Sequence, residues 1–186
     1  FPVKSAIEFL RQQIPSLNQL LPTPDPNHKV LSELAINLNG AVLIGHSQGG
    51  LFPAEAALSN PAGVKGIVMI EPSTCKAATY TDDEIAKLAK TPILIVFGDH
   101  LDADTGFPGF TWRLYYDDCM RFIGRIKAAK GNAKMLHPPS LGIRGNSHMI
   151  MQDKNNLQIA DLIMKWIDQN VKVRKPLYPW EMYARR

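Results

Sequence analysis

The sequence predicts an α/β fold with a mostly parallel sheet and helices on both of its faces. Short apolar runs alternate along the chain with longer segments in which apolar residues recur every three or four positions. Unbroken apolar runs are typical of strands buried on both faces, and helices supply the connections between such strands. The 186 residues suffice for one domain, which we place at residues 1–170, followed by a basic tail rich in proline and aromatic residues at 171–186.

Composition narrows the possible classes of function. The formal net charge is only +4, and the chain before the tail has no concentrated basic face with interleaved aromatics, so we expect no nucleic-acid partner. No apolar run approaches the length of a membrane span. Because neither a Cys/His cluster nor a phosphate-binding loop occurs, we expect no metal and no organic cofactor.

The first forty residues are predicted to form helices around a proline-rich loop. Apolar residues spaced by three and four over residues 1–20 predict an amphipathic helix, which Pro15 ends or kinks. Alternate prolines over residues 22–26 impose an extended loop. Residues 31–38 then predict a short helix that Asn39-Gly40 stops.

Four strands and four further helices are predicted after that point. The strands occupy residues 41–44, 66–70, 92–97 and 133–137. The helices occupy residues 51–58, 81–90, 111–130 and 156–170. The helix at 81–90 has a capping-box pattern, with Thr81 as its cap and Glu84 three residues later. The last helix places on one side the apolar residues Leu157, Ala160, Met164, Ile167 and Val171.

The stretch Gly45-His46-Ser47-Gln48-Gly49-Gly50 joins the first strand to the helix at 51–58. Strand, Gly-x-Ser-x-Gly and helix form the pattern of a nucleophile elbow, whose tight turn pushes the serine hydroxyl out of the sheet. We expect the glycines because side chains there would collide with the flanking strand and helix. The helix N-terminus and the Gln48 amide would then face a developing oxyanion. The alternative is a glycine-rich turn with a surface serine.

A serine nucleophile needs a histidine as base, and that histidine needs a carboxylate to orient it. In folds with such an elbow the base follows the serine and the acid along the chain, which excludes His28 and His46. We expect His148 as the base, because it lies in a loop after the last strand and just before the final helix. His137, at the end of the last strand, is the alternative.

Position alone leaves three candidates for the acid. Glu71 follows the second strand directly and is pinned by a proline. Asp99 and Asp102 follow the third strand, where His100 also lies, and a Gly-x-x-Asp pattern counted from Gly98 would put the acid at Leu101. The sequence therefore departs from that pattern, and Asp99 and Asp102 flank the expected position.

The chain resembles the α/β-hydrolase superfamily and, more narrowly, a small group of secreted bacterial esterases with a Ser-Glu-His triad whose glutamate follows the sixth strand. The matching stretches are Phe1-Pro2-Val3, Pro22-Thr23-Pro24, Gly45-His46-Ser47-Gln48, Glu71-Pro72, Val96-Phe97-Gly98-Asp99-His100, and Gly145-Asn146-Ser147-His148-Met149 running on to Gln158. The resemblance implies Ser47 as nucleophile, Glu71 as acid, His148 as base, and a secreted or periplasmic location. It does not cover the tail or the loop around residues 102–110.

An oxyanion hole needs two amides, and Gln48 supplies only one. In this fold the other comes from a loop after the third strand, and the residues before Ser47 contain no counterpart of it. A sheet that ends at the elbow strand would also expose an apolar edge. We therefore expect the carboxyl-terminal part of an α/β-hydrolase fold, cleaved from a precursor before Phe1 and completed by the amino-terminal chain of the same precursor.

The expected function is hydrolysis of small carboxylic esters through an acyl-enzyme. The same triad would serve a lactonase, thioesterase, amidase or acyltransferase, and a non-catalytic binding module is the alternative outside catalysis. Apolar candidates for a substrate pocket are Phe107, Phe110, Trp112, Met149 and Ile150. Cys75 and Cys119 are either one disulfide or two buried thiols, and a homo-oligomer is left open.

Overall fold

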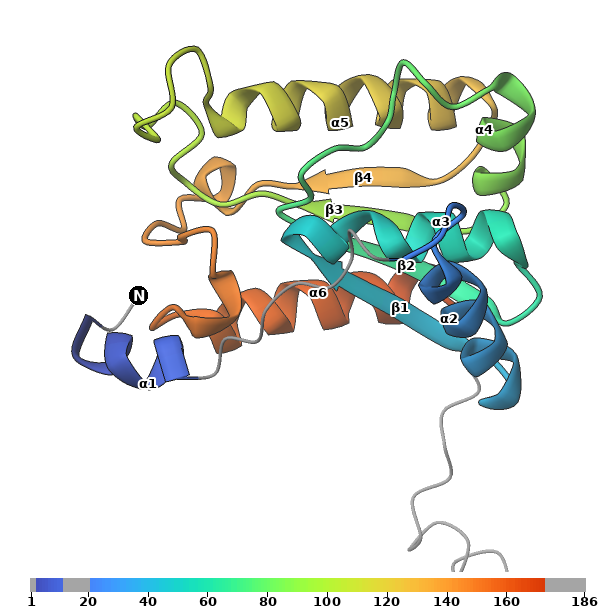
Figure 1. Cartoon of the computed structure of the whole chain (residues 1–186), viewed down its shortest axis with the longest axis horizontal. Helices are drawn as coiled ribbons and strands as arrows, with labels where there is room; N and C mark the ends of the chain where they lie inside the picture. The colour runs from blue at the N-terminus through green and yellow to red at the C-terminus, as the bar shows by residue number, and fades with distance from the viewer. Residues whose placement is uncertain (1–2, 12–20, 173–186) are drawn as a thin grey trace, which may run out of the picture.

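The computed structural model describes residues 3–11 and 21–172, and its centre is a four-stranded sheet in the order β1-β2-β3-β4 (Figure 1). The strands are β1 (Ala41–His46), β2 (Val64–Ile70), β3 (Ile93–Val96) and β4 (Ala133–Leu136). All neighbouring strands pair in parallel, which confirms the predicted sheet. Their carboxyl ends therefore meet at one edge of the sheet, where the loops that follow them can assemble a site.

Helices cover both faces of this sheet, as predicted. Their bounds are α1 (Ala6–Arg11), α2 (Pro26–Asn37), α3 (Phe52–Ser59), α4 (Asp82–Leu88), α5 (Trp112–Ala128) and α6 (Asn156–Asn170). One buried cluster joins α3, α4 and α5 to strand residues such as Ile67 and Ile95. A second cluster joins α6 to strand residues such as Val68 and Leu94 on the opposite face. No helix in the described ranges is long and apolar enough to cross a membrane.

The helix α2 begins five residues earlier than predicted, so the proline-rich loop is shorter than its prolines indicated. Pro26 occupies the first turn of α2, where a missing N–H costs nothing, and the Asp25 side chain accepts a hydrogen bond from the Asn27 amide at 2.9 Å. The capping box at Thr81 and Glu84 is confirmed at the start of α4. Of the helix predicted over residues 1–20, the part at 12–20 lies outside the described residues, as do residues 173–186 of the tail.

The apolar side of α6 that its sequence indicated packs on the sheet only at the carboxyl-terminal end, where Val171 is buried and Ile167 contacts the core. Leu157 and Met164 are 76% and 54% exposed, and the buried residues are Ile159, Ile163 and Trp166. The helix carries apolar residues on two sides, so their spacing alone does not select the buried one. The bulkier isoleucine and tryptophan side chains fill the space against the sheet.

The outer edge of β1 has no partner strand in the described part of the chain. Ile44, in the middle of this strand, is 57% exposed. An apolar stripe along α2 and its C-cap is exposed as well, formed by Val30, Leu34 and the capping residue Leu38 at spacings of four residues. An open apolar edge strand is a template for pairing with further polypeptide.

Cys75 and Cys119 form a disulfide that ties the loop after β2 to α5. Next to it the Asp118 carboxylate accepts hydrogen bonds from the Cys75 amide at 2.7 Å and the Thr74 hydroxyl at 3.0 Å. Both sets of contacts fix the segment that follows Glu71. The sequence left open whether the two cysteines form a disulfide or remain thiols, and in the structure they form a disulfide.

Replacing both cysteines by alanine should lower the free energy of unfolding by about 4 kcal/mol, because the bridge closes a long loop in the unfolded chain. The sequence separation that enters this value is 44 residues. Denaturant unfolding of the wild type and the Cys75→Ala/Cys119→Ala variant measures the difference. Excess reductant should abolish the difference, and an equal stability of the two proteins without reductant would contradict the bridge.

Candidate active site

Ser47 lies in the sharp turn after β1, as the first residue of the 3-10 segment Ser47–Leu51, which leads into α3. Its φ of 56° is in the left-handed region, which costs a non-glycine residue about 1–3 kcal/mol. A Cβ at Gly45 would collide with the Gly49 carbonyl, and a Cβ at Gly50 would lie 2.8 Å from Pro72 Cα. The glycine that the sequence analysis required at position 49 has open space around it, so the constraint falls on Gly45 and Gly50 instead.

The structure brings Ser47, His148 and Glu71 together in one chain of hydrogen bonds. His148 Nε2 lies 2.8 Å from Ser47 Oγ, and His148 Nδ1 lies 3.2 Å from Glu71 Oε2. A carboxylate only accepts, so Nδ1 carries the ring proton and donates it to Glu71. In that tautomer, Nε2 accepts the hydrogen bond from the Ser47 hydroxyl. A hydroxyl held against a free imidazole nitrogen is the arrangement that activates a serine.

Glu71 is held where the ends of β2 and β3 meet. It is only 4% exposed and has a φ of 45°, so its backbone turns sharply at the end of the strand. The Glu71 amide donates to the Val96 carbonyl at 2.8 Å, and the Gly98 amide donates a short hydrogen bond to Glu71 Oε1. One carboxylate oxygen is thus satisfied by the backbone just after β3, and the other is directed at His148.

Asp99, one alternative for the acid, contacts the loop that carries His148 instead of the His148 ring. It accepts hydrogen bonds from the Gly145 amide at 2.9 Å and the Asn146 side chain at 3.2 Å. Burial tends to raise the pKa of Asp99, but these hydrogen bonds outweigh it and the pKa is lowered. Asp99 is therefore ionised and serves as an anchor for this loop.

Asp102, the other alternative, forms a two-pronged ion pair with Arg113 at 2.9 and 2.6 Å. The hydrogen bond from that arginine lowers the pKa of Asp102. His137, the alternative base, lies 3.0 Å from the Ser140 hydroxyl and packs near Tyr116. None of these side chains contacts Ser47 or the His148 ring through a described hydrogen bond or ion pair.

Two contacts of His148 were missed by the sequence analysis. His46 Nε2 donates to the backbone carbonyl of His148 at 2.8 Å, and the two rings lie 4.7 Å apart. The Trp112 ring stacks on His148, with centroids 4.1 Å apart and planes 29° apart. His46 was set aside as a base because it precedes Ser47, although its place at the same strand end indicated proximity. No signal in the sequence linked Trp112 to His148.

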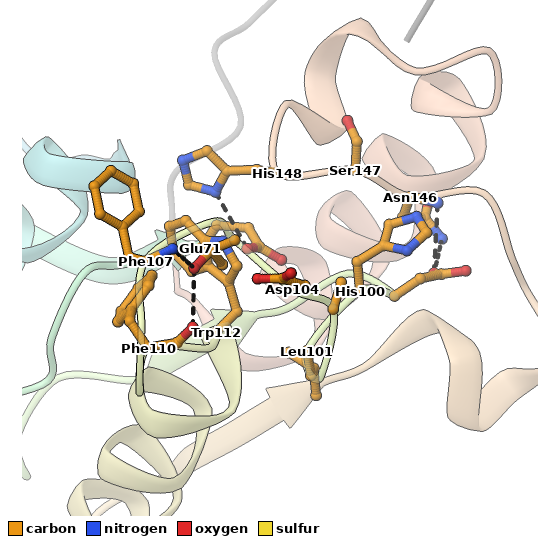
Figure 2. Close-up of a pocket in the computed structure, with 13 residues that line it drawn as sticks. Glu71, His100, Leu101, Asp104, Phe107, Phe110, Trp112, Asn146, Ser147 and His148 are labelled. Atoms are coloured by element: carbon orange, nitrogen blue, oxygen red, sulfur yellow. Dashed lines mark hydrogen bonds and ion pairs between the residues drawn. The ribbon is translucent and has the colours of Figure 1, made fainter.

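A cavity of about 430 Å³ adjoins this hydrogen-bonded group (Figure 2). Glu71 and His148 contribute to its wall, together with residues of the loop between β3 and α5. In Figure 2 the aromatic side chains Phe107, Phe110 and Trp112 lie on one side, and His100 lies on the other. Across residues 3–11 and 21–172, no group of three or more His, Cys, Asp or Glu side chains is arranged to hold a metal ion.

Neither a family model nor a curated protein sequence matches this chain. Among solved structures it is similar to a bacterial esterase, with 42% identity and a TM-score of 0.82 over 91% of this chain and 51% of the esterase. The chain thus spans about half of that esterase.

More distant structures share the fold alone. A predicted CIB-like hydrolase from Thermoplasma acidophilum is 14% identical, with a TM-score of 0.55 over 77% of this chain and 58% of that one. An α/β-hydrolase enzyme from the sediment metagenome of the Mar Chica lagoon in Morocco is 16% identical, with a TM-score of 0.50 over 76% and 68%.

Substituting His46 by glutamine should make the protein less sensitive to acid. Burial is the main cause that lowers the pKa of His46 below its ordinary 6.5. As the pH falls, His46 therefore becomes protonated earlier in the unfolded chain than in the folded chain. Stability therefore falls as the pH drops below about 6.5 and continues to fall until the pH reaches the folded-state pKa. Glutamine keeps an N–H donor for the His148 carbonyl but does not titrate.

The measurement is the melting temperature of the wild type and of His46→Gln at pH 7.5 and pH 5.5. The decrease between the two pH values should be smaller in the variant, since the other titrating groups are common to both proteins. An equal decrease in both proteins would contradict a lowered pKa for the half-buried His46.

Proposed function

We propose that this chain, which has part of an α/β-hydrolase fold, carries the nucleophile, base and acid of a serine esterase. The observation that carries the proposal is the continuous hydrogen-bonded series Ser47–His148–Glu71, with separations of 2.8 and 3.2 Å. The 42% identity to a bacterial esterase supports esters as the substrates.

In this mechanism Ser47 Oγ attacks the ester carbonyl while its proton passes to His148 Nε2. The imidazolium that forms is stabilised by the Glu71 carboxylate, whose other oxygen accepts a hydrogen bond from the Gly98 amide. The Gln48 amide, in the first turn after Ser47, donates to the oxyanion of the tetrahedral intermediate. His148 then protonates the leaving alcohol, which departs and leaves an acyl group on Ser47.

Water completes the cycle by attacking the acyl-enzyme. His148 acts again as the base, this time towards water, and returns the proton to Ser47 Oγ when the acid product leaves. The groups on this chain move only protons and the acyl group. The same steps would serve a lactonase, thioesterase, amidase or acyltransferase, and the likeness to an esterase is the observation that favours esters. The hydrogen-bonded triad argues against a non-catalytic binding module.

We further propose that a polypeptide segment outside the described residues completes the sheet along β1. The open strand edge, the exposed Ile44 and the apolar stripe on α2 support this, as does the 51% coverage of the similar esterase. Such a segment would supply the second oxyanion donor, and the amino-terminal chain of a cleaved precursor is the segment we propose. The disulfide supports a secreted or periplasmic location.

Mass spectrometry and gel filtration of the protein from its natural source test this second proposal. Active enzyme should have a larger mass than this chain alone, either in one polypeptide or in a complex of two. A 20.7 kDa monomer with full esterase activity would contradict it.

A fluorophosphonate probe should label the protein at Ser47, and Ser47→Ala should abolish the labelling because, within residues 3–11 and 21–172, no other serine hydroxyl is paired with a histidine and a carboxylate in this way. Glu71→Gln should lower kcat/KM for an activated ester roughly 10⁴-fold, since an amide neither fixes the required tautomer nor stabilises the imidazolium. Asp99→Asn is the matched control and should lower kcat/KM less than about tenfold, because Asp99 only anchors the loop.

The order of these two effects is the discriminating result. A larger loss in Asp99→Asn than in Glu71→Gln would assign the acid to Asp99. Absence of labelling in the wild-type protein would reject the enzyme altogether.

A further inference from the structure

The cavity beside the triad lies on the side of the base. His148 and Glu71 line it, and Ser47 does not. In ester hydrolysis the protonated base must deliver its proton to the oxygen of the leaving alcohol, so that alcohol lies next to the imidazole. The cavity is therefore placed for the alcohol part of the substrate.

Aromatic rings form one wall of this cavity. Phe110 and Trp112 pack edge to face with centroids 6.1 Å apart, and the stack of Trp112 on His148 links this wall to the base. Phe107, from the same loop, is 71% exposed although it is a large apolar side chain. Aromatic faces of this kind attract apolar groups and, through their quadrupoles, organic cations.

The charge that lines the cavity is negative. The Asp104 carboxylate accepts a hydrogen bond from the Gly106 amide at 2.8 Å and forms no ion pair with any described residue. Glu71 and Asp99 also line the cavity, but their oxygens are occupied by His148, Gly98 and the loop at 145–146. Asp104 is therefore the carboxylate that a ligand can use.

Among the described residues that line the cavity, only the two histidines are basic. The cavity is lined by neither lysine nor arginine. Arg113, the neighbour of Trp112 in the sequence, is neutralised by its two hydrogen bonds to Asp102. A leaving alcohol with an anionic group would meet Asp104 without a compensating cation.

We propose that this cavity is the alcohol subsite and that it selects esters whose leaving alcohol carries a cation, with a quaternary ammonium group as the best fit. Phe110, Trp112 and Phe107 contact the methyl groups of the cation, and Asp104 supplies the opposite charge. A quaternary ammonium suits this wall because it has no N–H donors. The aromatic rings offer no hydrogen-bond acceptors, so a cation with N–H groups would leave donors unpaired against them. This inference rests on the proposed esterase function.

The test compares acetylcholine with its uncharged isostere, dimethylbutyl acetate, on the full-length protein. The two esters differ in charge and hardly in shape. The ratio of kcat/KM for the cationic ester to that for the neutral ester should exceed one and should fall about fivefold in Asp104→Asn. The matched control is Asp168→Asn near the far end of α6, which should leave the ratio unchanged.

Protection of Ser47 provides a second measurement that needs no substrate turnover. Phenyltrimethylammonium should slow fluorophosphonate labelling of the wild type, and a higher concentration should be needed for the same effect in Asp104→Asn. Labelling that this cation does not slow, or a ratio that Asp104→Asn leaves unchanged, would overturn the cationic subsite and leave the esterase proposal intact. Absence of labelling by the probe alone would overturn both.

Discussion

The carboxylate of Glu71, held between the Gly98 amide and His148 Nδ1, is the interaction on which the rest of the site depends. A carboxylate that is 4% exposed is tolerated only when its oxygens are hydrogen-bonded. The parallel pairing of β2 with β3 supplies the first partner, because it places the residues after Ile70 beside those after Val96. The second partner, His148 Nδ1, lies beside Glu71 only when the loop at 145–149 is folded against the strand ends.

That loop is fixed by hydrogen bonds to two carboxylates and by a close backbone approach. Asp99 holds the backbone at Gly145, and Asp153 accepts from the Ser147 amide at 2.6 Å and hydroxyl at 2.8 Å. A Cβ at Gly98 would lie 2.7 Å from the Asn146 carbonyl oxygen, so a larger residue there would push the loop away. The position of His148 is thus set by backbone approach as much as by its own hydrogen bonds, and this rigidity preorganises the site.

The sequence predicted the parts that local patterns determine. Unbroken apolar runs identified three strands, the weaker pattern at 133–137, which Lys134 interrupts, indicated the fourth, and the elbow motif located Ser47. The Gly-x-x-Asp pattern could not identify the acid, because the position three residues after Gly98 holds Leu101, which is buried in the core. The roles of Asp99 and Trp112 depend on contacts between segments far apart in the chain. The buried side of α6 was also beyond sequence reasoning, because the helix is apolar on two sides and the choice follows from packing.

The most direct measurement of the central claim is the mass of the intermediate in mid-turnover. Acid quenching of the full-length protein during hydrolysis of a nitrophenyl ester should trap one acyl group, and peptide mapping should locate it on Ser47. In Glu71→Gln the trapped group should form far more slowly, at the same residue, because the hydrogen-bonded base is no longer oriented. Turnover with the acyl group on another side chain, or equal rates of acylation in the two proteins, would contradict the account.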